Sequence, residues 1–172
     1  MVVRHLAAIV MPFTMAVLVP LWIVRTDDRA AVGGLPAFAS QLAGVAALAI
    51  GLLLFVSSVR HFAVQGRGTL APWDPPKLLV VAGPYRYVRN PMISGVVFIL
   101  AGEALVLVSR PLALWALLFL CVNLVYIPLL EEPLLVERFG DAYREYCREV
   151  HRIVPRARPW DPRGRRGVSE RA

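Results

Sequence analysis

The sequence has few cysteines, and they lack the spacing of a metal site or a disulfide framework. Cys121 lies in an apolar run and Cys147 in a charged segment, and no Cys-x-x-Cys motif occurs. The histidines His5, His61 and His151 are scattered, and solvated positions near a membrane surface account for them. We therefore expect neither a structural disulfide nor a bound metal ion.

Charged residues are also scarce, and the signals of a soluble nucleotide-binding fold are missing. Only 18% of the residues are charged, whereas 58% are hydrophobic and the mean hydropathy is +0.60. Soluble domains are closer to half apolar. No G-x-G-x-x-G motif follows a strand-like run, and strands do not alternate with helices, which excludes a Rossmann-type site. The composition indicates an all-α polytopic membrane helical bundle, a single membrane domain over residues 1–172.

Basic residues outnumber acidic ones by 19 to 12, which gives a formal net charge of +7. In a soluble protein this excess would suggest nucleic acid as a partner. Here the basic residues fall in the loops and in the tail. We therefore expect membrane lipids, through their anionic headgroups, to be the partners, and no nucleic acid.

Apolar runs at about residues 6–24, 37–59, 92–108 and 112–130 predict about four transmembrane helices. Residues 1–60 then hold two N-terminal spans and residues 61–90 a long loop. Residues 91–155 form a helical hairpin with C-terminal amphipathic helices, and residues 156–172 form a basic tail, disordered toward its end. Four spans place both termini and the long loop on one side. Because that side carries nearly all Arg and Lys, we expect it to be cytoplasmic, in a bacterial-type inner membrane.

A few residues within the apolar runs stand out. Gly44, Ala47 and Gly51 recur at spacings of three and four, so they share one helical face that permits close approach of another helix. Glu103 lies about 11 residues into the third run. Such an acid is either functional, close to the far interface, or hydrogen-bonded to a neighbouring helix. Asn123 in the fourth run has the same alternatives.

The chain changes character after the fourth run, where acidic, basic and apolar residues alternate at helical spacing. Leu135, Phe139, Tyr143 and Tyr146 recur at intervals of four, four and three, so they share one face. This pattern predicts a helix, a turn at Gly140, and a second amphipathic helix along the membrane surface.

The most distinctive stretch is Gly83-Pro84-Tyr85-Arg86-Tyr87-Val88-Arg89-Asn90-Pro91. Its two prolines fix φ, and the residue before each is pushed toward extended geometry. The stretch therefore holds its arginines and tyrosines in a defined arrangement at a helix entrance. Ser109-Arg110-Pro111 joins the last two spans tightly, so this entrance should meet the pair Glu131 and Glu132 at the end of the fourth span.

Such a pocket suits S-adenosylmethionine. Arginine forms a bidentate fork with a carboxylate, tyrosine rings stack on a base and attract a cation, and a carboxylate accepts ribose hydroxyls or pairs with an amine. The alternative is that the tyrosines and arginines are only an interfacial anchor, and that the two glutamates are only a helix-end charge.

The stretch from about residue 77 to residue 155 resembles the isoprenylcysteine carboxyl methyltransferase and phospholipid methyltransferase group of membrane enzymes. The Gly83–Pro91 stretch, two spans, the Glu pair, Phe139-Gly140 with the following tyrosines, and Arg152 with Pro155 occur in the family order. The resemblance implies S-adenosylmethionine as the cofactor and a lipidic or membrane-embedded acceptor. It assigns catalysis to Arg89 and Asn90, and cofactor binding to Lys77, Leu78, Leu79, Val80, Tyr85, Arg89, Asn90, Pro91, Met92, Ile93 and Glu131 or Glu132.

This sequence departs from the family pattern in three places. Asn90 replaces the family histidine, and an amide cannot act as a base near neutral pH. Ile93 replaces the family tyrosine. The arginine that prenylcysteine enzymes use for the acceptor carboxylate falls near Ile127, which argues for a neutral, amine or thiol acceptor instead.

Two functions other than methyl transfer fit parts of the sequence. The replaced histidine and tyrosine favour a non-catalytic scaffold or lipid-binding protein that keeps the methyltransferase fold. A small transporter is the third hypothesis, but few polar residues lie within the spans and no repeated halves occur.

Overall fold

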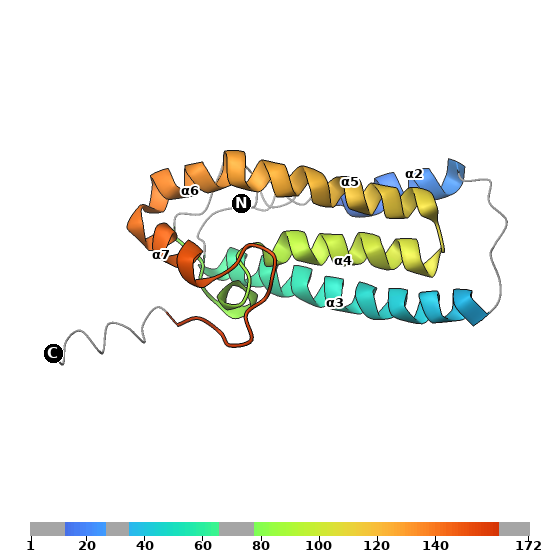
Figure 1. Ribbon diagram of the computed structural model, residues 1–172, viewed down its shortest axis with the longest axis horizontal. Helices are drawn as coiled ribbons and strands as arrows, with labels where there is room; N and C mark the ends of the chain where they lie inside the picture. Colours follow the sequence, from blue (N-terminus) through green and yellow to red (C-terminus); the bar gives the residue numbers. More distant parts are fainter. Residues whose placement is uncertain (1–12, 27–34, 66–77, 162–172) are drawn as a thin grey trace.

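The computed structural model describes residues 13–26, 35–65 and 78–161, and these residues form helices and connecting segments without a strand. This confirms the predicted all-α class. Figure 1 shows α2, α3, α4 and α5 lying side by side, with α6 and α7 at one end. The elements are η1 (Thr14–Leu18), α2 (Val19–Thr26), α3 (Leu35–Gln65), η2 (Gly83–Arg86), α4 (Pro91–Val106), α5 (Arg110–Tyr126), η3 (Ile127–Glu131), α6 (Glu132–Phe139) and α7 (Asp141–Glu149).

Two helical segments are long and apolar enough to cross a membrane. One is Ala37–Phe62 within α3, and the other is Arg110–Phe139, in which α5 continues through the π-helical turn η3 into α6. Their large apolar side chains are mostly exposed, for example Leu53 at 73%, Leu114 at 66% and Leu129 at 67%. The core helix of a water-soluble protein would bury such side chains. This exposure fits helices that face lipid.

The structure confirms only two of the predicted four spans among the described residues. Pro91–Val106 and Thr14–Thr26 are apolar but shorter. A helix of the length of α4 reaches about 24 Å, less than the roughly 30 Å of a bilayer core. Residues 1–12, which include the start of the first predicted run, lie outside the described residues, as does the interior of the long loop.

Two predicted boundaries also move. Helix α3 continues to Gln65, beyond the predicted end near residue 59, since no proline or glycine lies between residue 59 and Gly66. At the other end, the sequence predicts that residues 156–161 belong to the basic tail. They belong to the folded part instead, because Arg156 and Trp160 donate backbone hydrogen bonds to earlier residues.

Helices α3 and α4 pack closely through glycines that face each other in pairs. A Cβ atom added to Gly51 would lie 2.8 Å from the carbonyl oxygen of Gly95, and one added to Gly44 would lie 2.8 Å from that of Gly102. Both distances are far below van der Waals contact. The predicted small-residue face of α3 is therefore confirmed at Gly44 and Gly51, and its partner is α4.

We expect Gly51→Leu to destabilise the protein by about 1–3 kcal/mol, because the added side chain must separate the two helix backbones. The change should appear as a lower thermal unfolding temperature in detergent micelles. Ala46→Leu adds similar bulk on an exposed face of α3 and should leave the unfolding temperature unchanged. Equal effects of the two substitutions would contradict the glycine contact.

The hairpin between α4 and α5 is as tight as predicted. Ser109 is the N-cap of α5, and its hydroxyl accepts a hydrogen bond from the backbone N–H of Leu112. Within α5, Asn123 donates to the carbonyl of Phe119 in its own helix, which supports a structural role. Glu103 lies in α4, and its Oε2 is buried without a hydrogen-bond partner among the described residues.

The predicted helix, glycine turn and second helix are confirmed as α6, Gly140 and α7. Gly140 has φ +56, in the left-handed region that favours glycine. The turn folds α7 back, so that the apolar faces of the two helices gather around one cluster. Its buried members are Tyr143, Tyr146, Val150 and Trp160, and Leu79, Val81, Leu135, Val136, Phe139 and Cys147 pack against it.

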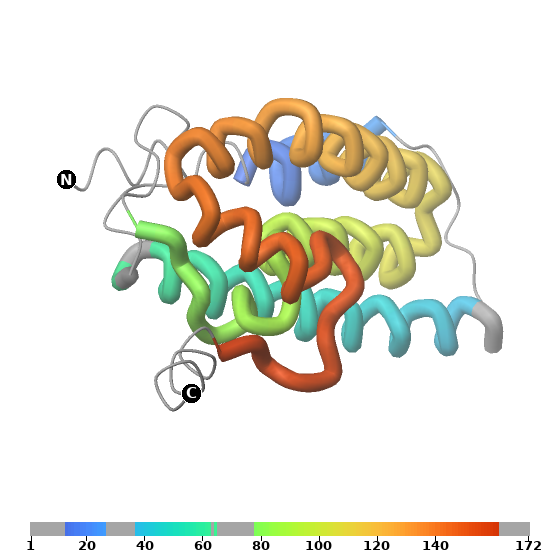
Figure 2. Tube along the Cα trace, turned by 60° about the vertical axis from the view of Figure 1, so that its left-hand side comes forward, coloured from blue at the N-terminus to red at the C-terminus, as the bar shows by residue number. Residues whose placement is uncertain are grey.

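After α7 the chain turns back across the segment that precedes α4, as Figure 2 shows at the red end of the trace. The backbone N–H of Arg89 donates to the carbonyl of His151, that of Arg156 to Tyr87, and that of Trp160 to Arg86. We call residues 150–161 the C-terminal strap. It brings the start of α4 and the end of α7 together.

Candidate functional site

The Tyr/Arg stretch is rigid before it reaches α4. Pro84 lies in the first turn of the 3₁₀-helix η2, where the missing N–H costs nothing. The backbone N–H groups of Tyr87 and Val88 both donate to the carbonyl of Pro84. Gly83 has φ +54, which allows the sharp entry into the turn. These features fix the direction of Tyr85 and Arg89.

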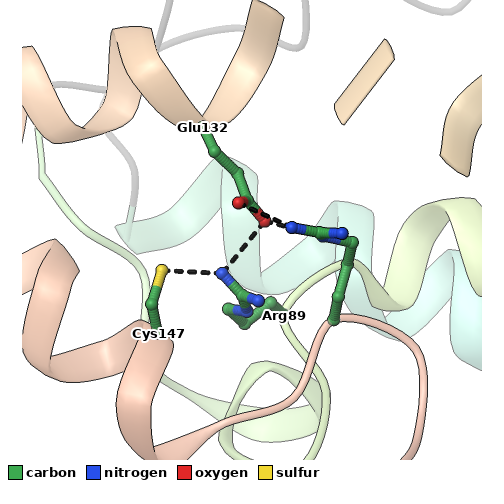
Figure 3. Close-up of polar contacts among 4 residues, drawn as sticks. Arg89, Glu132 and Cys147 are labelled. Carbon is green, nitrogen blue, oxygen red and sulfur yellow. Dashed lines mark hydrogen bonds and ion pairs between the residues drawn. The ribbon is translucent and has the colours of Figure 1, made fainter. Parts of the chain in front are cut away.

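A buried ion-pair cluster joins this stretch to the end of the long apolar helix (Figure 3). Nη1 of Arg89 lies 3.0 Å from Oε1 of Glu132. Arg152, from the C-terminal strap, binds both carboxylate oxygens of Glu132, each at 2.8 Å. Arg89 also donates to Sγ of Cys147 on α7. The predicted meeting of the two polar groupings therefore occurs, and it occurs through Glu132.

The cluster is shielded from solvent and carries excess positive charge. The side chains of Arg89 and Glu132 are 10% and 16% exposed, and that of Arg152 is 30% exposed. Two guanidinium groups share one carboxylate, and Nε of Arg89 is buried without a partner among the described residues. The hydrogen bonds that Arg152 donates to Glu132 raise the pKa of the Arg152 guanidinium. The cluster therefore keeps a donor and a positive charge for an anionic group.

Glu131 and Tyr85 lie beside the cluster. Burial raises the pKa of the Tyr85 phenol well above its usual range, and the nearby Glu131 carboxylate raises it further. Tyr85 is therefore neutral at physiological pH. The Tyr146 hydroxyl donates to the backbone carbonyl of Tyr85 at 2.6 Å, which ties η2 to α7. No described residue forms a hydrogen bond or an ion pair with Glu131, in contrast to Glu132.

The other predicted residues lie in different environments. Leu78 is exposed, Leu79 packs against the apolar cluster around Tyr146, and Val80 is buried. Met92 and Ile93 occupy the first turn of α4, and Lys77 lies outside the described residues. Pro91 is buried. Asn90 is the N-cap of α4, but its side chain forms no cap hydrogen bond.

Four residues near the site were not among the predicted site residues: Cys147, Arg152, Trp160 and His61. Cys147 follows Tyr143 by four residues, so its position on the inner face of α7 could have been predicted from helical spacing. The sequence singles out Arg152 only through the family motif order, which gives it no role at the site. The positions of Trp160 and His61 could not be predicted from the neighbouring sequence. The position of Trp160 depends on the fold of the strap, and that of His61 depends on the extension of α3.

The surface also has a pocket of about 370 Å³, lined by His151, Arg152, Ile153 and Val154. Of these residues only Arg152 belongs to the ion-pair cluster. We therefore do not assign the pocket as the cofactor site, and we base the site on the cluster and its neighbours Tyr85, Asn90 and Glu131.

Residues 39–142, more than half of the chain, match the phospholipid methyltransferase family. The chain belongs to this family of membrane methyltransferases. No curated protein and no solved structure matches the chain significantly. The family match covers Arg89, Glu131 and Glu132 but ends before Cys147, Arg152 and Trp160, so the place of these last three at the site comes from the geometry alone.

Proposed function

We propose that this member of the phospholipid methyltransferase family is an integral membrane, S-adenosylmethionine-dependent methyltransferase with a lipidic, membrane-embedded acceptor. The observation that carries the proposal is the Arg89–Glu132–Arg152 cluster at one end of the exposed apolar helices. A polar site at the end of lipid-facing helices can receive a soluble cofactor from water and an acceptor from the bilayer. We propose further that this end is cytoplasmic.

The donor set fits the polar parts of the cofactor. The unpartnered Nε of Arg89 and the excess positive charge would hold its amino-acid carboxylate. The unengaged carboxylate of Glu131 would accept the ribose hydroxyls or pair with the amino group, and the neutral Tyr85 would stack on the base. Glu132 would not contact the cofactor, because both of its oxygens already bind arginine. Its role is to position Arg89.

When bound, the cofactor supplies a methyl group on a sulfonium, which an acceptor nucleophile can take by in-line displacement. The protein contributes orientation and exclusion of water. Arg89 is fixed by Glu132 and Cys147, and the C-terminal strap closes the site on one side. None of these residues needs to form a covalent bond.

The test is binding of S-adenosylmethionine to the purified protein in detergent, measured by calorimetry. We expect saturable binding by the unaltered chain and a dissociation constant at least about tenfold higher for Glu131→Gln, since a lost charge-assisted hydrogen bond costs about 1.5–3 kcal/mol. Glu145→Gln, an exposed position on α7, is the matched control and should bind normally. Absence of binding by the unaltered chain would reject the proposal.

A non-catalytic scaffold remains the second candidate, because Asn90 and Ile93 replace the family histidine and tyrosine. The two functions differ in one measurable result. Transfer of labelled methyl groups into extracted lipid supports the enzyme, whereas binding without transfer supports the scaffold.

A further inference from the structure

The C-terminal strap exposes two neighbouring aliphatic side chains, which we call the apolar pair. They are Ile153, which is 43% exposed, and Val154, which is 67% exposed. The segment that carries them has no helix or strand. Neither residue belongs to the buried cluster, which the strap joins through Val150 and Trp160 instead. Packing within the chain therefore does not account for the apolar pair.

The apolar pair lies at the end of the apolar helices, where a membrane surface is expected. On one side of the pair, the carbonyl of His151 accepts a hydrogen bond from the backbone N–H of Arg89, two residues before α4 begins. On the other side, Arg156 donates to Tyr87, an exposed aromatic residue of the kind that lies at headgroup level. Figures 1 and 2 both show the strap alongside the bundle near the start of α4.

Basic groups lie on both sides of the apolar pair. Arg152 precedes it, and the exposed Arg158 follows it. Arg152 donates to Glu132 through Nε and Nη2, and its Nη1 forms no hydrogen bond with the described residues. The one acid of the strap, Asp161, forms an ion pair with Arg86. The strap therefore presents positive charge beside apolar side chains, which complements an anionic lipid surface.

The pocket of about 370 Å³ on the strap has the same two-part character. It is lined by two polar residues, His151 and Arg152, and by the apolar pair. A phospholipid joins an anionic phosphate to acyl chains, so it matches both parts of this lining. A free phosphate ion would match only the basic part and would leave the apolar pair in water.

Resting on the membrane location in the proposed function, we propose that the strap docks onto the anionic surface of the bilayer that α3 and α5 cross. The apolar pair enters between the headgroups and reaches the start of the acyl chains, while Nη1 of Arg152 and the guanidinium of Arg158 bind lipid phosphates. The bilayer thereby holds the strap against Arg89 and keeps Arg152 on Glu132. Contact with anionic lipid thus helps to keep the ion-pair cluster assembled.

Methyl NMR of the protein in phosphatidylglycerol nanodiscs tests where the apolar pair lies. A small share of the lipid carries a nitroxide near the start of its acyl chain. We expect the methyl signals of Ile153 and Val154 to lose at least half of their intensity, as should that of Leu114, an exposed residue of α5. If Leu114 alone loses intensity, the inference is overturned while the proposed membrane location stands. If none of the three loses intensity, both fail.

A second experiment measures whether lipid contact holds the strap. In the same nanodiscs, we expect Ile153→Ser combined with Val154→Ser to make the amide of Arg156 exchange hydrogen about tenfold faster, because the apolar gain from leaving water is lost. Ala157→Ser changes an exposed position of the same strap and is the matched control, so its exchange should equal that of the unaltered chain. Equal exchange in the double variant and the control would overturn the inference.

The lipid composition tests the anionic part of the proposal. In phosphatidylcholine nanodiscs, the Arg156 amide of the unaltered chain should exchange about fivefold faster than in phosphatidylglycerol, since an arginine near an anionic surface contributes about 1 kcal/mol. Equal rates in the two lipids would overturn the anionic assignment. Protection that appears only in discs holding two chains would assign the apolar pair to a second copy, and this would overturn the docking onto lipid.

Discussion

Glu132→Ala is expected to lower the free energy of unfolding by about 3–5 kcal/mol and to abolish binding of S-adenosylmethionine. The substitution leaves the guanidinium of Arg89, only 10% exposed, without its carboxylate, and breaking a buried pair from one side has this cost. It also removes both hydrogen bonds that hold Arg152. The measurements are chemical unfolding in detergent and calorimetric titration with the cofactor.

Two further variants test the cause of this loss. Glu137→Ala removes an exposed acid from the same helix and should change the unfolding free energy by less than about 0.5 kcal/mol. Glu132→Met combined with Arg89→Met removes both buried charges and should regain stability without regaining cofactor binding. If Glu132→Ala resembled Glu137→Ala in stability, the cluster would not be a structural centre of the fold.

The opposite behaviour of Glu131 and Glu132 could not be predicted from the sequence. Both residues end the same apolar run, and the resemblance assigned cofactor binding to either of them. The difference arises from Arg152, which reaches Glu132 only because the C-terminal strap folds back on residues 86–89. The path of the strap depends on the burial of Trp160 against residues of α7, which precede it in the sequence. No local pattern in the proline-rich strap predicts this contact.

What could be predicted are features with a short-range cause. The glycine face of α3, the hairpin at Ser109, and the helices on either side of Gly140 follow from helical periodicity and turn chemistry. The meeting of Arg89 with the Glu pair follows from the hairpin alone. The lengths of the spans were less predictable. Hydropathy locates an apolar run, but Pro91 decides where α4 begins, and Leu107 and Val108 leave the helix although they are apolar.

Trp160→Ala is expected to release the C-terminal strap and to lower stability by about 3–5 kcal/mol, the usual cost of removing a buried tryptophan. Trp160 is 8% exposed, and its ring lies 5.6 Å from that of Tyr146. Without this anchor the end of the strap loses its buried apolar contact, and only Val150 at the start of the strap stays in the cluster. The backbone amides of Arg89, Arg156 and Trp160, which donate across the strap, should then exchange hydrogen much faster.

The exchange experiment also tests whether the strap belongs to the site or only covers it. A released strap should withdraw Arg152 from Glu132, so the dissociation constant for S-adenosylmethionine should rise about tenfold even while α3 and α4 stay protected from exchange. Trp22→Ala, at a position 66% exposed on α2, is the matched control and should leave the strap amides protected. Fast exchange at Arg156 with unchanged cofactor affinity would show that Arg89 and Glu132 hold their geometry without the strap, because Arg152 would then contribute nothing to binding.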